Sequence, residues 1–145
     1  MTMLVLDANI LMRAVLGKGT RALLARYGER GEFVAPDNAF EEARRRLPQV
    51  IEWRKLQQAP FMAYFDSLAD VVRIVGIEAY SGFEAVARQR LARRDEDDWP
   101  ILATALALRC PIWTEDTDFF GCGVATWTTD RVELYMVEAI SLVGP

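Results

Sequence analysis

The sequence predicts an α/β fold in which a parallel sheet is covered by helices on both faces. Short apolar runs alternate with segments whose apolar residues recur at helical spacing, and this alternation is typical of parallel sheets. The β-branched run Val71–Val75, bounded by Gly76, is the clearest strand. The run Leu4–Leu6 stops at Asp7 and has the length and character of a buried strand.

The other elements follow in the same alternation. The predicted strands are Leu4–Leu6, Phe33–Ala35, Val71–Val75, Pro111–Trp113 and Val124–Trp127. Helical spacing predicts helices from Ile10 to Gly17, Thr20–Arg30, Pro36–Pro48, Val50–Ala69, Glu78–Arg94, Ile101–Leu108 and Thr129–Leu142. Pro48 is predicted to end one helix and Pro60 to break the next, because proline lacks the backbone donor that a helix interior uses.

Composition indicates one globular domain over residues 1–145. The chain is 52% hydrophobic and 26% charged, which is ordinary for a folded domain of this length. No apolar run approaches the roughly 20 residues of a membrane helix, and the N-terminus lacks the basic and long apolar regions of a signal peptide. We therefore expect a cytoplasmic protein with no membrane association.

The absence of histidine removes whole classes of mechanism. Because the sequence contains no histidine, no catalytic triad with histidine, no histidine-dependent nuclease chemistry and no His-ligated zinc site is available. Cys110 and Cys122 do not form a C-x-x-C redox pair. The net charge of −4 argues against a large basic face for duplex DNA. Carboxylates remain, and they are the ligands that Mg²⁺ and Mn²⁺ prefer.

Several carboxylates fall where an α/β sheet binds its ligands, which is beyond the carboxyl ends of the strands. Asp7 directly follows the first strand, and Asp116 lies three residues after Trp113. Asp98 begins an apolar helix, and Glu42 lies in the helix after the second strand. Unpaired carboxylates in one crevice repel one another, and a divalent cation would offset that repulsion.

A purely structural interpretation of the same residues stays open at this point. Aspartate is a favoured N-cap, so Asp7, Asp37 and Asp98 can each be explained by helix capping. The acidic run Asp95–Asp98 can equally be solvated surface.

Three segments resemble the PIN domain family, which includes VapC-type toxins and PilT N-terminus-like proteins. They are Leu4–Leu11 (LVLDANIL), Asp98–Ala105 (DWPILATA) and Ile112–Phe119 (IWTEDTDF). They keep the family's order and spacing, and the resemblance covers essentially the whole chain. It implies a three-layer α/β/α sandwich with a central, mostly parallel sheet, and an endoribonuclease that depends on one or two Mg²⁺ or Mn²⁺ ions.

The resemblance also implies roles for individual residues. The four acidic positions of the family, which bind metal and carry catalysis, match Asp7, Glu42, Asp98 and Asp116. Asp118 assists in metal binding, and Asn9 and Thr114 support the site. Glu41 and Asp97 remain alternatives to their neighbours at the second and third positions.

Substrate contacts are less marked in the sequence. Arg13 lies one helical turn beyond Asn9, within reach of a phosphate near the metal. Most other arginines, including Arg44–Arg46, are interpreted as solvated helix faces, and Trp113 and Trp127 as core residues.

The family implies partners as well as a substrate. A small antitoxin protein covers the acidic groove in toxin–antitoxin pairs, but here Glu115 stands where a basic residue is usual, and the segment Gly121–Thr129 is closer to the PilT N-terminus-like subset. We expect an RNA substrate and a homodimer, with the interface in the region Val50–Ala69. The alternatives are a non-catalytic scaffold that binds RNA or protein, and a metal-dependent phosphatase. The phosphatase needs a lysine after a late strand, and the lysines are Lys18 and Lys55.

Overall fold

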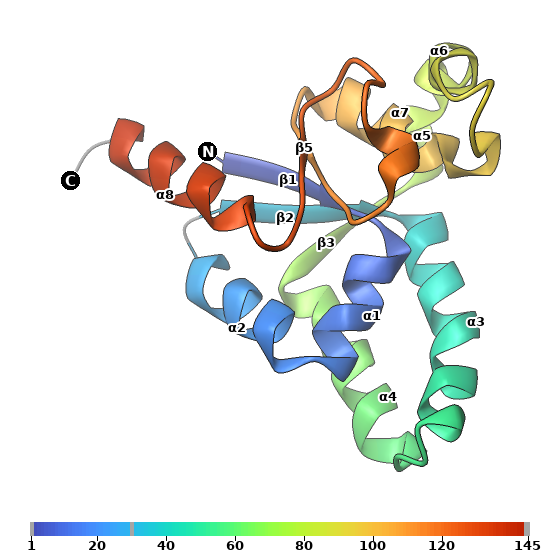
Figure 1. The fold of residues 1–145 in the computed structure, drawn as a ribbon, viewed down its shortest axis with the longest axis vertical. Coiled ribbons are helices and arrows are strands. Elements are labelled where there is room, and N and C mark those ends of the chain that lie inside the picture. Colours follow the sequence, from blue (N-terminus) through green and yellow to red (C-terminus); the bar gives the residue numbers. More distant parts are fainter. Residues whose placement is uncertain (1, 30, 144–145) are drawn as a thin grey trace.

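The computed structural model describes residues 2–29 and 31–143, and these form a parallel sheet of five strands (Figure 1). The strands are β1 (Thr2–Leu6), β2 (Gly31–Pro36), β3 (Val72–Val75), β4 (Ile112–Trp113) and β5 (Thr126–Trp127). Their order across the sheet is β3-β2-β1-β4-β5, and every neighbouring pair is parallel. The predicted sheet is thus confirmed, with β1 at its centre.

Helices cover both faces of this sheet. They are α1 (Ala8–Leu16), α2 (Lys18–Tyr27), α3 (Asp37–Trp53), α4 (Gln58–Ser67), α5 (Ile77–Tyr80), α6 (Glu84–Arg90), α7 (Trp99–Leu108) and α8 (Val132–Val143). In Figure 1, α1 to α4 lie on one side of the sheet and α5 to α7 on the other. The Tyr135 hydroxyl of α8 donates to the Met3 carbonyl of β1 over 3.3 Å. The result is the expected α/β/α sandwich.

The core lies between β1 and the helices packed on it. Val5 and Leu6 are fully buried, as are Leu102 and Ala103 of α7. Burying a leucine or valine side chain contributes about 1.5–3 kcal/mol. Helix α7 is therefore internal, as its apolar sequence predicts, and it carries Asp98 at its start to the edge of the core.

The prediction that Pro48 ends a helix is wrong. Helix α3 continues through Pro48 to Trp53, and the Pro48 carbonyl accepts a hydrogen bond from Gln58 Nε2 over 2.7 Å. A proline inside a helix costs about 3 kcal/mol, but the burial of Leu47 and Ile51 on either side offsets it. The chain leaves the helix only near Lys55, whose φ of 58° is left-handed.

Other boundaries also differ from the prediction. Pro60 lies within the first turn of α4 and does not break it, because a first-turn residue needs no backbone donor. The helix predicted over Glu78–Arg94 is divided into α5 and α6 by a 3₁₀ turn at Ser81–Phe83, which contains the poor helix former Gly82. Strand β5 is shorter than Val124–Trp127, since the preceding loop turns at Gly123 with φ of 91°.

The last predicted helix begins later than expected, at Val132 instead of Thr129. Trp113 is buried as predicted, whereas Trp127 is only half-buried against Tyr135, with ring centroids 5.6 Å apart. Cys110 and Cys122 are buried free thiols. Within the described ranges, no helix combines the length and apolar character that a membrane span requires.

Candidate functional site

The carboxyl ends of β1 and β4 meet at one edge of the sheet. Their register pairs Leu6 with Trp113, so that Asp7 and Thr114 follow adjacent strands. The Thr114 hydroxyl donates to Asp7 Oδ2, and it accepts from the Asp116 backbone N–H over 2.9 Å. Thr114, which is fully buried, therefore connects two of the predicted acidic residues.

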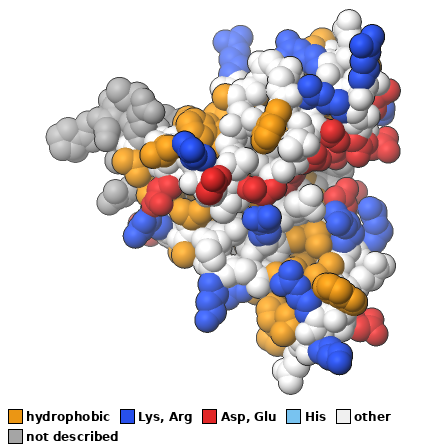
Figure 2. Space-filling model, in the orientation of Figure 1, with side chains coloured by type: hydrophobic (Ala, Val, Ile, Leu, Met, Phe, Trp, Pro, Cys, Tyr) orange, Lys and Arg blue, Asp and Glu red, His pale blue; other side chains and the backbone are white. Residues whose placement is uncertain are grey.

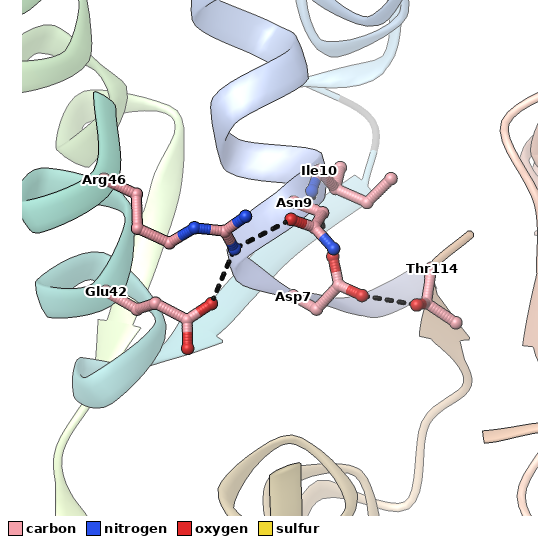
Figure 3. Close-up of polar contacts among 6 residues, drawn as sticks. All are labelled: Asp7, Asn9, Ile10, Glu42, Arg46 and Thr114. Carbon is pink, nitrogen blue, oxygen red and sulfur yellow. Dashed lines mark hydrogen bonds and ion pairs between the residues drawn. The ribbon is translucent and has the colours of Figure 1, made fainter. Parts of the chain in front are cut away.

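Asp7 caps α1 as the structural interpretation predicts. Its Oδ1 accepts from the Ile10 backbone N–H over 2.9 Å, and Figure 3 shows it between Ile10 and Thr114. The residue is 6% exposed, which is unusual for a carboxylate. Asp98 makes no capping hydrogen bond with its side chain, so capping does not account for its place at the start of α7.

All four predicted carboxylates line one crevice of about 30 Å³ at this edge. They come from four separate segments of the chain. The residues that line the crevice are Asp7, Ala8, Asn9, Asn38, Ala39, Glu42, Asp98, Ile101 and Asp116. The alternatives Glu41 and Asp97 are not among them, and both are exposed. Asp118 also lies outside this lining, and its backbone N–H donates to Asp116 Oδ1 over 2.9 Å.

Burial and mutual repulsion disfavour negative charge in the crevice. Desolvation, with smaller effects from Asp95 and Asp116, raises the pKa of Asp98 to about 7. Desolvation also raises the pKa of Asp7 to about 6, against the opposing hydrogen bonds from Thr114 and Ile10. Figure 2 shows acidic side chains in a band across the middle of this face, with arginine and lysine side chains on both sides. A bound cation would favour the ionised form of both residues.

The donor atoms of the crevice suit a hard cation. Its carboxylate oxygens are joined by Asn38 Oδ1, a buried acceptor without a hydrogen-bond donor among the described residues. Over residues 2–29 and 31–143, however, no three acidic or cysteine side chains converge closely enough to hold a metal ion as they stand. The oxygen atoms fit Mg²⁺ or Mn²⁺, but the side chains would have to close around the ion.

Arg46 of α3 pairs with one of these carboxylates, Glu42. Its Nη1 donates to Glu42 Oε2 over 3.3 Å and to Asn9 Oδ1 over 3.2 Å (Figure 3). Glu42 and Arg46 are four residues apart on one helix face, where such pairs form readily. The Arg46 guanidinium therefore bridges α1 and α3 beside the crevice.

A larger groove adjoins the crevice. It has a volume of about 580 Å³ and shares Asn9 with the crevice. Its lining comprises Asn9, Met12, Arg13, Leu16, Gly17, Gly19, Thr20, Val50, Arg54, Glu115 and Thr129. Arg13, predicted to contact substrate, thus lies in the groove and not among the carboxylates.

Two residues of the site were not predicted from the sequence: Asn38 lies in no marked motif, and Arg46 was expected to be solvated surface. Asn38 is in the first turn of α3 after β2, as Asn9 is in the first turn of α1 after β1. That equivalence is the sequence signal that could have identified Asn38. No comparable signal marks Arg46 among its arginine neighbours.

Comparisons with solved structures give chains that share this architecture. Chains from a VapBC2 complex of Rickettsia felis bound to a promoter DNA fragment match with a TM-score of 0.67, 14% identity and coverage of 88% of this chain and 98% of that one. A chain from a toxin–antitoxin complex of Klebsiella pneumoniae matches with a TM-score of 0.60 and 21% identity, and the match covers 87% of this chain and 97% of that one. PAE2754 from Pyrobaculum aerophilum matches with a TM-score of 0.72 and 12% identity, and the match covers 94% of this chain and 90% of that one. No match was found among curated proteins.

The sheet order, the two helix layers and the acidic carboxyl edge define an α/β/α domain of the PIN class. A family model described as the PIN domain matches residues 5–137. The chain belongs to the PIN domain family.

Proposed function

We propose that the protein is a Mg²⁺- or Mn²⁺-dependent endoribonuclease whose catalytic residues are Asp7, Glu42, Asp98 and Asp116. One observation carries the proposal: these carboxylates, from four separate segments, line a single crevice at the carboxyl edge of a PIN-family sheet. Membership of the family favours nuclease chemistry, and the absence of histidine leaves a metal as the best-supplied catalyst.

The four carboxylates would hold one or two ions, with Asp118 assisting. When bound, such an ion lowers the pKa of a water molecule and offsets charge on the leaving oxygen of a phosphodiester. Thr114 and the Ile10 N–H fix the orientation of Asp7. In the same proposal Asn9 and Thr114 are positioning residues, because each acts through another side chain.

The solved relatives suggest a partner. Two of them are chains from toxin–antitoxin complexes, so we propose that this protein is a VapC-type toxin, acts in the cytoplasm and is covered by a small antitoxin. For the homodimer we propose the region Val50–Ala69, where Trp53 is 81% exposed and Leu56 is 38% exposed. Exposed large apolar side chains at such a site favour a protein contact.

The test is cleavage of defined RNAs by the purified protein. We expect cutting with Mn²⁺, none with EDTA, and none with Asp7→Asn in either condition. Products should carry 5′-phosphate and 3′-hydroxyl ends. Asp97→Asn is the matched control, since Asp97 lies outside the crevice and should leave the rate unchanged. An Asp7→Asn protein that cut RNA at the wild-type rate would overturn the assignment.

One observation favours a second candidate, a scaffold that binds RNA or protein without cutting it. The carboxylates do not converge on a common point in the part of the chain that the structure describes. Calorimetric titration with Mn²⁺ separates the two, because a scaffold has no need of a divalent site. A phosphatase is disfavoured, since neither Lys18 nor Lys55 lines the crevice.

A further inference from the structure

The groove beside the crevice has the size and lining of a small-ligand site. Its volume of about 580 Å³ lies within the range of about 300–1,000 Å³ typical of such pockets. Met12, Leu16 and Val50 provide an apolar surface, and the charged residues Arg13, Arg54 and Glu115 lie around it. Because Asn9 lines both spaces, the groove adjoins the carboxylates.

Glu115 presents a fixed hydrogen-bond acceptor to this groove. Its Oε2 accepts from the Thr129 backbone N–H over 2.6 Å. The Thr129 hydroxyl in turn accepts from Trp113 Nε1 over 3.1 Å, and Trp113 is buried in the core. The other oxygen, Oε1, accepts no hydrogen bond from the residues that the structure describes. The protein therefore holds the carboxylate through one lone pair of Oε2, and the second lone pair of Oε2 and both of Oε1 remain for donors of a ligand.

The two arginines of the groove are also available. Several arginines near the site pair with acids, such as Arg44 with Asp66 over 2.9 Å and Arg46 with Glu42 over 3.3 Å. For Arg13 and Arg54, no ion pair or side-chain hydrogen bond occurs within residues 2–29 and 31–143. Unpaired guanidinium groups beside an apolar surface suit the phosphates of a single-stranded nucleic acid.

We propose that this groove binds one unpaired guanine nucleotide of the RNA strand, next to the phosphate that is cut. The inference rests on the proposed function and names its specificity. Bases in single strands are recognised through their pairing edges. Guanine presents two adjacent N–H donors there, N1–H and N2–H₂, which match a carboxylate acceptor. Uracil presents a single N–H between two carbonyl oxygens, which a carboxylate repels. Arg13 and Arg54 bind the flanking phosphates.

The test measures binding of 5′-GMP, 5′-AMP, 5′-CMP and 5′-UMP to the wild-type protein in EDTA, by calorimetry. Removing divalent ions separates base recognition from cleavage. We expect 5′-GMP to bind about tenfold or more tighter than 5′-UMP, the selectivity that a bidentate base contact supplies. Glu115→Gln keeps an acceptor for the Thr129 N–H, and it should remove this preference. Glu52→Gln, an exposed change on α3 outside the groove, is its matched control.

A second pair of variants tests the phosphate contacts. Arg54→Ala should weaken the binding of all four nucleotides by a similar factor, whereas Arg45→Ala, also exposed but outside the groove, should leave their binding unchanged.

Equal affinity for 5′-GMP and 5′-UMP, or no effect of Glu115→Gln, overturns the guanine assignment even if Mn²⁺-dependent cleavage is present. Failure of all four nucleotides to bind overturns the nucleotide site and leaves the groove to a protein partner. Guanine-selective binding without any cleavage would overturn only the nuclease.

Discussion

The crevice and the groove are neighbours with opposite character. The crevice holds four carboxylates around about 30 Å³, which equals the volume that one water molecule occupies in the liquid. The groove is about 580 Å³ and combines an apolar surface with two arginines that form no ion pair with any residue that the structure describes. The crevice concentrates negative charge in a very small volume, which suits a metal ion. The groove has a larger volume and more widely spaced charges, which suits a segment of a nucleic-acid chain.

The two regions share helices α1 and α3. On α1, Asn9 lines both regions and Arg13 lines the groove one turn later. On α3, Glu42 lines the crevice and Val50 lines the groove. The difference in character therefore arises within a few helical turns, and single substitutions can separate the two regions.

The largest expected effect contrasts acids inside the crevice with acids just outside it. Glu42→Gln and Asp98→Asn should each reduce RNA cleavage by about a hundredfold or more, because each removes charge stabilisation worth several kcal/mol. Glu41→Gln and Asp97→Asn should leave the rate within about twofold, as expected for surface sites. Initial rates in Mn²⁺ measure both pairs. If Glu41→Gln lost as much activity as Glu42→Gln, or Asp97→Asn as much as Asp98→Asn, the crevice would not define the site.

A second effect tests the burial of charge in the crevice. Burial raises the pKa of Asp7 to about 6, so the folded state retains a proton that the unfolded chain has released. Stability is therefore lost as the pH rises from about 4 to about 6. Asp7→Asn should stabilise the metal-free protein by up to about 3 kcal/mol at about pH 8, and by much less near pH 4.

Urea unfolding in EDTA at both pH values measures this difference. Asp37→Asn is a useful comparison, since Asp37 begins α3 at the same edge but does not line the crevice. An Asp7→Asn protein that was equally stable relative to wild type at both pH values would contradict the assignment of the raised pKa.

A third effect assigns the cation to one region. Mn²⁺ at about a hundredfold excess over its Kd should stabilise the wild-type protein by about 2.7 kcal/mol. Asp98→Asn should remove most of that gain, whereas Glu115→Gln, in the groove, should retain it. Thermal unfolding with and without Mn²⁺ gives the shifts. Loss of the gain in Glu115→Gln alone would place the ion in the groove instead.

The smallest effect is expected at the boundary. Arg46→Ala removes an exposed pair with Glu42, which should change stability by less than about 1 kcal/mol. Because Glu42 is then no longer paired with the Arg46 guanidinium, the affinity for Mn²⁺ should rise by a few fold. Calorimetry measures this affinity, with Arg45→Ala as the matched control. Weaker Mn²⁺ binding in Arg46→Ala would mean that the bridge to Asn9 supports the site.

The sequence was most informative where patterns are local. Alternating apolar runs predicted the parallel sheet, and the position of Asp7 after a strand predicted its place at the sheet edge. Pro48 was misjudged because the buried residues Leu47 and Ile51 outweigh a local preference. The single domain over residues 1–145 stays a prediction.

The candidate site shows the same limit. The spacing of the motifs could not decide between Glu41 and Glu42, or between Asp97 and Asp98. The side chains of adjacent residues point in different directions, and packing determines which of them faces the crevice. The structure brings Glu42 and Asp98 to the crevice, whereas their catalytic role is still to be tested. Asn38 was missed because a lone asparagine after a strand is common in turns.

The uninterrupted path of α3 through Pro48 has a consequence for how a strand would be cut. Glu42 and Val50 are eight residues apart on one helix, which fixes them about 12 Å apart along its axis. A break at Pro48 would have allowed the two ends to move separately. Under the proposed function, the continuous helix α3 would fix the distance between the two regions, so the position of a bound base would determine which phosphate reaches the carboxylates.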